Sequence, residues 1–291
     1  MRGLRVDHVT WAGGELEGLR AAMEAAGLPS EYGGGHANGV THMAVIGFPD
    51  GSYVELLAPR VPGRPSPVWE RAIRSEAGPA AWAARCGDLA AEAERLRGRG
   101  IPVRGPEPWS RETPEGETAA WELAFPGPGE PGSSLPFLIE DRTPRRRRAR
   151  PGPRIGRTGL SGVAEVVLLA GDLDGAARSF RTAYGWPAPR PDRSDGLGAR
   201  LARFEGTPVT LATPLDAGEA SGPASEAAAR LASRLEGSGP APCAFVLGVD
   251  DPGAAAAALR WGGEEAWAAG RVRWIAVDGP GDRRLGVRWP S

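Results

Sequence analysis

The chain has 291 residues, of which 41% are hydrophobic, so it is long enough to form two domains with sizeable cores. Its formal net charge of -1 at pH 7 excludes a strong overall field for nucleic acid or membrane surfaces, and no apolar run approaches the roughly 20 residues of a membrane span. Only Cys86 and Cys243 are present, which argues against a disulfide framework or a thiolate zinc cluster. The start of the chain has no apolar signal core, so we expect a cytoplasmic protein.

The first predicted elements are a short strand and an amphipathic helix within residues 6–29. Two clear strands follow at residues 41–48 and 52–59, separated by turn residues. The three histidines of the chain all lie in its first 42 residues: His8, His36 and His42. Any site built on imidazole groups is therefore expected in this part.

The opening strand and helix recur at residues 81–102. Placing Leu89 on Leu16 gives an offset of 73, and the same offset carries Gly27 onto Gly100 and Pro29 onto Pro102. Strands are again expected after the helix, in "TAAWELAFP" and "LPFLIED". Matches at one common offset indicate an internal repeat.

Third and fourth copies begin at residues 163–187 and 243–263. The repeating unit is therefore βαβββ, used four times, and the predicted fold class is α+β. One additional helix is expected at residues 222–237, before the fourth copy. Its apolar residues recur at helical spacing, so we expect it to pack along the domain or between domains; they are Ala228, Leu231 and Leu235.

Residues 144–159, "PRRRRARPGPRIGRTG", separate the two pairs of copies. Their Arg, Pro and Gly content predicts an exposed linker between an N-terminal domain, residues 1–143, and a C-terminal domain, residues 160–291. An arginine run can also indicate a nucleic-acid contact. This run is short, has no interleaved aromatic residues and lies in a nearly neutral chain, so the linker is favoured and no nucleic-acid partner is expected.

Paired βαβββ modules with a histidine on the first strand and a glutamate on the last resemble the vicinal oxygen chelate superfamily. The resemblance is greatest to its glyoxalase-like domain family, which is related to bleomycin-resistance proteins and extradiol dioxygenases. The segments that carry it are "VDHVTW", "GGGHANGVTHMAVIGFPDGSYVELLAP", "WAARCGDLAAEAERLRGRGIPV" and "LPFLIED". It implies two open-barrel domains, each made of two modules that curl around a concave face.

The resemblance also implies a divalent metal ion on the concave face, held by ligands from the first and last strands of each module. By position, the candidate metal ligands are His8, Glu55 and Glu140, whereas Ala81 stands where the second first-strand ligand is expected. One imidazole and two carboxylates suit Mn, Fe(II), Ni, Zn or Mg, with open positions left for substrate. His42 or His36 is an alternative source of a fourth ligand.

Three residues are candidates for moving a proton: the two glutamates of the metal set, Glu55 and Glu140, and His36 in the glycine loop of residues 32–39. The alternative interpretation is structural. In that case His8 is a hydrogen-bonded barrel residue, Glu55 is a strand carboxylate paired with an arginine, Glu140 is a surface acid and His36 is solvated.

Five residues are candidates for substrate binding: Trp11, Trp109, Arg111, Trp121 and His42. The tryptophans would form a flat apolar wall, and the arginine would bind a substrate carboxylate through two hydrogen bonds. Each has a simpler alternative: core packing for the tryptophans, a solvated position for the arginine, and a half-buried strand position for the histidine.

The C-terminal domain lacks an equivalent set. An offset of 157 places Glu165 at the position of His8, and the strand pattern places Thr210 at that of Glu55. The last copy offers Ala244 and "RRLGVRW", without a carboxylate. Extradiol dioxygenases carry their metal in this half, so ring cleavage is not expected, and we expect a structural role for this domain.

The leading hypothesis is a glyoxalase-like enzyme of small-molecule metabolism, with lyase or isomerase chemistry in the N-terminal domain. The alternative is a binding protein that sequesters a small molecule, as the antibiotic-binding relatives do. A third hypothesis is an interaction module with filled barrels. A small-molecule ligand is the expected partner, and a homodimer stays an open alternative.

Overall fold

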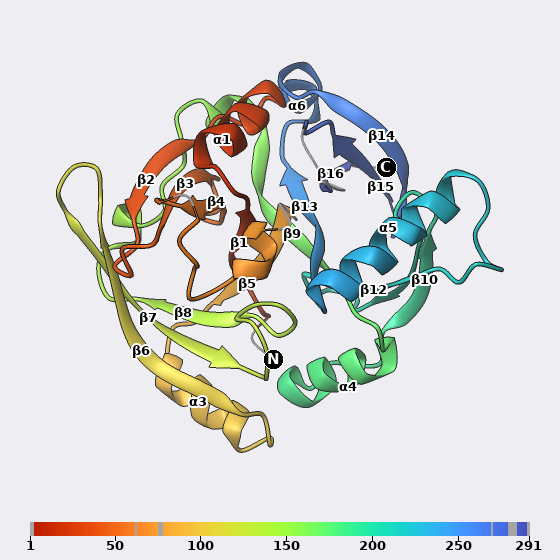
Figure 1. Ribbon diagram of the computed structural model, residues 1–291, viewed down its shortest axis with the longest axis horizontal. Coiled ribbons are helices and arrows are strands. Elements are labelled where there is room, and N and C mark those ends of the chain that lie inside the picture. Colours follow the sequence, from red (N-terminus) through yellow and green to blue (C-terminus); the bar gives the residue numbers. More distant parts are fainter. Residues whose placement is uncertain (1–2, 62, 75–77, 269, 279–283, 290–291) are drawn as a thin grey trace.

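The computed structural model describes residues 3–61, 63–74, 78–268, 270–278 and 284–289. The chain forms two halves that lie side by side, each a curved sheet with helices packed against it (Figure 1). Each half contains one eight-stranded sheet. The predicted α+β fold, with four βαβββ modules in two open-barrel domains, is confirmed.

The N-terminal sheet has the strand order β2-β3-β4-β1-β5-β8-β7-β6, so the first strands of the two modules lie side by side at its centre. The first module comprises β1 Val6–Ala12, α1 Leu16–Ala25, β2 Glu31–Gly35, β3 Thr41–Gly47 and β4 Tyr53–Pro59, followed by α2 Glu70–Arg74. The second comprises β5 Gly78–Arg85, α3 Leu89–Arg97, β6 Val103–Glu112, β7 Thr118–Pro126 and β8 Phe137–Asp141.

The C-terminal sheet repeats this order as β10-β11-β12-β9-β13-β16-β15-β14. The third module comprises β9 Leu160–Leu169, α4 Leu173–Tyr184, β10 Arg190–Ser194, β11 Ala199–Arg203 and β12 Val209–Pro214. The helix α5 Pro223–Ser238 precedes the fourth module, β13 Ala241–Val249, α6 Pro252–Ala258, β14 Trp261–Trp267, β15 Gly270–Ile275 and β16 Leu285–Trp289.

Local sequence explains why the modules repeat. Asp88, Asp172 and Asp251 each accept a hydrogen bond from a backbone N–H in the first turn of the helix that follows, as good N-cap residues do. The matched glycines after the first two helices, Gly27 and Gly100, have φ of +90° and +78°. Side chains other than glycine rarely adopt such angles, so the matched glycines mark equivalent turns.

The expected additional helix is confirmed as α5, which packs against β11, β12 and β13 of the C-terminal sheet (Figure 1). Ala228 and Leu231 are buried there, and Leu231 joins a core cluster with Leu201 and Trp267. The helix therefore belongs to the C-terminal domain. In the part of the chain that the structure describes, no helix is long and apolar enough to cross a membrane.

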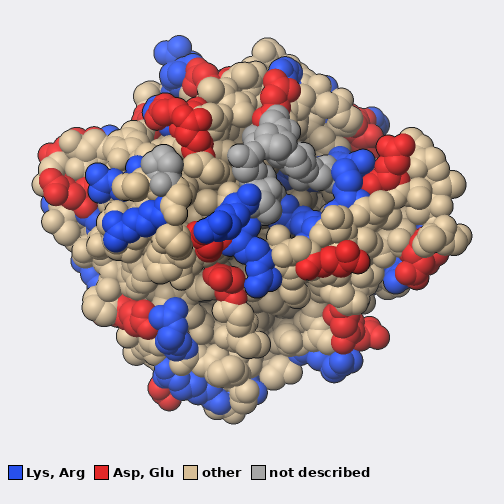
Figure 2. All heavy atoms as spheres, viewed as in Figure 1, with Lys and Arg blue, Asp and Glu red and all other residues tan. Residues whose placement is uncertain are grey.

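The two domains share one hydrophobic core. The Trp11 ring lies 6.3 Å from the Phe245 ring, and the Trp82 ring lies 6.4 Å from the Phe180 ring, measured between ring centroids. Both contacts join the N-terminal to the C-terminal domain. On the face shown in Figure 2, positive and negative side chains are interspersed.

The prediction of an exposed linker at residues 144–159 is wrong for part of this segment. A 3-10 turn at Arg145–Arg147 brings Arg148 and Ala149 into the N-terminal domain, where they are 4% and 6% exposed. Ile155 is also buried. The composition suggested solvation, but the arginines find carboxylate partners and so can be buried. The domain boundaries themselves stay a prediction.

Candidate active site

The concave face of the N-terminal sheet lines a partly open cavity of about 70 Å³, which has room for several water molecules. The edges of the sheet meet on one side of it, where His36 and Arg111 form a backbone bridge between the β2–β3 loop and β6. One half of the lining comes from the first module and is polar. The other half comes from the second module and is largely aromatic.

His8 lies on the central strand β1, is buried and lines the cavity. A register shift between β1 and β5 at this point places two residues of β1 opposite one of β5, a bulge that can re-aim a side chain. Asp7 Oδ1 lies 2.8 Å from His8 Nδ1. The imidazole stacks on Tyr53 with ring centroids 4.6 Å apart, and the edge of Phe137 also packs against it. Its orientation is therefore set from three sides.

Glu55, on β4, is paired in register with Thr10 and turns its carboxylate into the same cavity. The Thr10 hydroxyl donates to Oε2 over 3.0 Å, His36 Nε2 lies 3.3 Å from Oε1, and His8 Nε2 lies 3.9 Å from Oε2. Burial alone would raise the pKa of Glu55. The hydrogen bond and charge of His36, with smaller contributions from His8 and Thr10, lower it to about 2, so Glu55 is an anion.

His36 is held by the loop that ends the glycine-rich segment. Its Nδ1 lies 2.8 Å from the Thr41 hydroxyl, and Asn38 Oδ1 accepts the backbone N–H groups of Val40 and Thr41 in a tight turn. This leaves Nε2 directed at Glu55. His36, a candidate for moving a proton, lies in the cavity lining, and its role stays a prediction.

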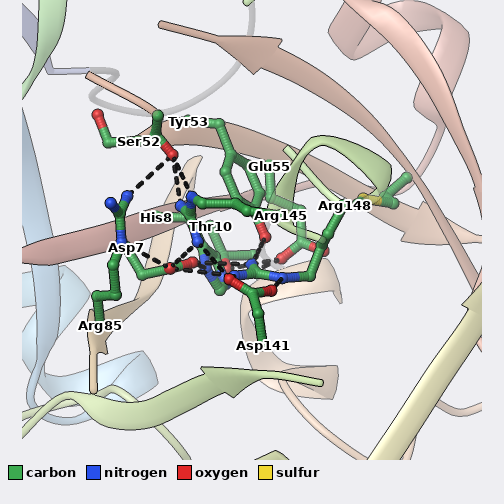
Figure 3. A network of polar contacts seen from close by, with 12 residues as sticks. Asp7, His8, Thr10, Ser52, Tyr53, Glu55, Arg85, Asp141, Arg145 and Arg148 are labelled. Atoms are coloured by element: carbon green, nitrogen blue, oxygen red, sulfur yellow. Dashed lines mark hydrogen bonds and ion pairs between the residues drawn. The ribbon is translucent and has the colours of Figure 1, made fainter. Parts of the chain in front are cut away.

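A buried ion-pair network supports His8 from behind (Figure 3). Arg148 donates to Asp7 over 2.8 Å, to Asp141 over 2.7 Å and to the Tyr53 hydroxyl over 2.9 Å. Arg145 also pairs with Asp7, over 2.6 Å. Burial would raise the pKa of Asp7, but the charge of Arg148 and the hydrogen bonds from His8 and Arg148 lower it well below its usual value.

Sequence reasoning missed Asp7, Tyr53 and Arg148. The first carried a signal, because an aspartate inside the strand "VDHVTWA", which is buried throughout, needs a buried partner. Arg148 carried none, because it meets Asp7 across 141 residues of chain.

The second half of the cavity is an aromatic wall formed by Trp109, Trp121, Phe125 and Phe137 of the second module, and Trp69, just before α2, extends it. Trp109 and Trp121 are cross-strand neighbours on β6 and β7. The structure therefore places these two predicted tryptophans, together with Arg111, in the cavity lining. Whether they bind a ligand stays a prediction.

The structure does not bring Glu140 to this site. Its Oε2 accepts the backbone N–H of Leu89 at the start of α3 over 2.9 Å, and its Oε1 pairs with Arg142 over 2.8 Å. In the first module Thr10 pairs with Glu55, and in the second Ala83 pairs with Phe137. Because Ala83 is Thr10 plus 73, Phe137 is the counterpart of Glu55. The proposed match of Glu140 was three residues out of register.

Trp11 and His42 also lie outside the cavity. Trp11 is fully buried against the C-terminal domain, so core packing is its role. His42 alternates with Met43 on β3: Met43 lines the cavity, and His42 is half-buried on the other face near Tyr32. Burial, followed by the charge of Arg60, lowers the pKa of His42. Neither residue can contact a ligand in this cavity.

The residues present do not fit the metal ion that the family resemblance implies. Two of the four expected positions hold Ala81 and Phe137, which have no donor atom, and Glu140 is turned away. His8 and His36 approach different oxygens of Glu55. Among the residues that the structure describes, no three His, Cys, Asp or Glu side chains are grouped so as to hold a metal ion.

The corresponding centre of the C-terminal domain is an internally paired cluster. Glu165 accepts hydrogen bonds from Thr210, Arg203, Trp267 and Arg288, and no imidazole lies there. The strand register confirms that Thr210 stands at the position of Glu55. All of these donors come from the protein itself, so the Glu165 carboxylate is fully hydrogen-bonded, in contrast to the Glu55 carboxylate of the N-terminal domain.

Comparisons with known proteins agree with the fold. The sequence model of a family described as "Glyoxalase-like domain" matches residues 6–164. No curated protein matches. Among solved structures, a hypothetical protein from Staphylococcus aureus is similar with a TM-score of 0.60 at 12% identity, over 86% of this chain and 93% of that one.

Two enzymes are similar over nearly the whole chain. A 4-hydroxymandelate synthase variant from Streptomyces coelicolor has a TM-score of 0.59 at 14% identity, over 99% of this chain and 92% of that one. A halotolerant catechol dioxygenase has a TM-score of 0.52 at 10% identity, over 98% and 87%. At these identities the likeness shows the fold alone.

Proposed function

The chain belongs to the glyoxalase-like domain family, and on that basis we propose that it is an enzyme that moves a proton on a small organic molecule held in its N-terminal cavity. The observation that supports this most is the cluster of His8, Glu55 and His36 in the lining of a partly aromatic cavity, with Asp7 hydrogen-bonded to His8 from behind. Burying ionisable groups costs free energy of folding, and perturbed pairs of this kind concentrate at catalytic sites.

His8 is the acid–base group in this proposal. The Asp7 carboxylate is an anion, so it accepts the Nδ1–H of His8 and leaves Nε2 to exchange a proton inside the cavity. Glu55, also an anion, lies beside Nε2 and stabilises the imidazolium that forms when His8 takes a proton. Asp7 and Arg148 are positioning residues, because they act through His8.

The reaction class that suits this set is isomerisation or elimination at a carbon next to a carbonyl or carboxyl group. Such a reaction needs a base, an acid and a cation near the oxygen that gains charge. His8 and His36 supply the first two, and Arg111 lines the same cavity. The chain's own side chains are sufficient for these steps, and none of them is routed through a metal ion.

A proton-exchange assay tests this proposal without knowledge of the natural substrate. Pyruvate, phenylpyruvate and phenylacetaldehyde are incubated in D₂O, and proton NMR follows the loss of their acidic C–H signals. We expect the wild type to accelerate exchange of at least one compound, and His8→Ala to lose about 100-fold or more of that acceleration. His42→Ala is the matched control, because His42 lies outside the cavity. A panel in which His8→Ala exchanges as fast as the wild type contradicts the proposal.

The aromatic wall supports a second candidate, a protein that binds a flat small molecule without changing it. In that case ligand binding persists in His8→Ala and no compound exchanges its protons faster than in buffer. The same samples therefore separate the two functions.

A further inference from the structure

Arg111 is a buried cation that forms no ion pair with a carboxylate among the residues that the structure describes. Its side chain is 5% exposed and lines the cavity. Its Nη1 donates to the carbonyl of Gly33 and contacts the sulfur of Met43, and its Nη2 donates to the carbonyl of Arg148. The remaining guanidinium donor, Nε, is buried without a hydrogen-bond partner among the described residues. Neutral carbonyl groups hold the guanidinium in place but do not balance its charge.

The carboxylates nearest the cavity are already matched by other groups. Asp7 and Asp141 pair with Arg145 and Arg148. Glu55 is bound by His36 and Thr10. Burial lowers the pKa of Arg111 although the charges of Glu55 and Glu115 oppose this shift, the direction expected for a cation that has left water without a full counter-charge.

A buried guanidinium without a counter-ion costs several kcal/mol, and an anion that enters the same cavity recovers part of that cost. A carboxylate suits it best, because the guanidinium presents planar donors that match two carboxylate oxygens. Two residues before Arg111 on the same strand β6, Trp109 also lines the cavity, together with Trp121 and Phe137.

We infer that the ligand of this cavity is a small organic monocarboxylate whose charged end faces Arg111 and whose flat apolar body packs on the aromatic wall. The inference rests on the proposed function for the identity of the site, since it names the substrate class of that site. The experiment that tests it measures ligand binding and does not require the protein to catalyse a reaction.

Two ligands of nearly the same shape, 4-fluorobenzoate and 4-fluorobenzamide, isolate the contribution of the charge. Fluorine NMR titrations measure the dissociation constant of each with the full chain. We expect the carboxylate to bind at least tenfold more tightly than the amide to the wild type, and Arg111→Met to reduce this preference to within about twofold. Equal binding of the two ligands to the wild type, or binding of neither, overturns the inference.

Arg203→Met is the matched control, because Arg203 is a comparably buried arginine that lines a cleft of the C-terminal domain. It is expected to keep the tenfold preference, and its loss there overturns the assignment to Arg111. Thermal unfolding of each variant checks that the chain is folded. If Arg111→Met does not fold, Arg111→Lys replaces it: this variant keeps a charge but loses the planar donors, so it must weaken the carboxylate and not the amide.

The outcomes separate this inference from the proposed function. Absence of proton exchange with a retained carboxylate preference contradicts the enzyme and supports the binding inference. Proton exchange with equal binding of acid and amide contradicts the inference alone.

Discussion

Phe137 occupies in the second module the position that Glu55 occupies in the first, as the pairings of Thr10 with Glu55 and of Ala83 with Phe137 show. The pseudo-symmetric barrel therefore has a polar half and an aromatic half. One half can position charged groups and the other can hold an apolar body, so the asymmetry itself organises the site.

Because the second module lacks metal-ligating side chains at the two equivalent positions, we expect that introducing them by substitution creates a metal-binding site. The double variant Ala81→His with Phe137→Glu places donors at both empty positions, opposite His8 and Glu55. We expect it to bind Co(II) with an absorption spectrum in the visible range, and the wild type and Phe137→Leu to bind it at least tenfold more weakly. Stoichiometric Co(II) binding by the wild type that is lost in His8→Ala would contradict the structural correction of the metal set.

Arg148 is expected to be a major determinant of stability. Replacing it by methionine leaves Asp7 buried without its main counter-charge, which costs about 3–5 kcal/mol of the free energy of unfolding. The measurement is urea unfolding of the full chain. Arg146→Met is the control, because Arg146 is exposed two residues earlier and its removal should change stability by less than about 0.5 kcal/mol. Equal effects of the two substitutions would mean that the arginine segment is a solvated linker after all.

Two tryptophans should separate stability from ligand binding. Trp11→Ala removes a fully buried ring from the domain interface and should cost about 3–5 kcal/mol of the free energy of unfolding. Trp109→Ala removes half of the Trp109–Trp121 pair and should weaken 4-fluorobenzoate binding about tenfold. Denaturant unfolding and fluorine NMR are measured on both variants. A larger binding loss in Trp11→Ala than in Trp109→Ala would refute this division.

Stability should fall in acid because of Glu55. Its pKa is about 2 in the folded chain against an ordinary value of 4.5, so its stabilisation is fully present above about pH 5 and is lost as the pH falls towards 2. The shift corresponds to roughly 3 kcal/mol. Urea unfolding between pH 7 and pH 3 should show a shallower decline for Glu55→Gln than for the wild type. An equal decline for Glu55→Gln and the wild type would exclude this role of Glu55.

Glu140 and Glu55 also have different expected effects on the site. Glu140→Gln should leave 4-fluorobenzoate binding within about twofold of the wild type, because the side chain contacts α3 and Arg142. It should cost about 1 kcal/mol, since the hydrogen bond to the start of α3 weakens. Loss of ligand binding in this variant would show that Glu140 reaches the cavity in solution.

The sequence alone determined the repeated module, because strand and helix periodicity, N-cap residues and glycines such as Gly27 and Gly100 are local signals. It also named His8, Glu55, His36, Trp109, Trp121 and Arg111 as candidates, and the structure places all six in the lining of one cavity. The tertiary structure decided which face each side chain presents and which distant residues it meets. Side chains that are an odd number of residues apart on a strand point to opposite faces of the sheet. Glu140 is three residues from Phe137, the true counterpart of Glu55, so its side chain lies on the face away from the cavity. The Asp7–Arg148 pair joins residues 141 apart in the chain, and no local pattern records such a contact.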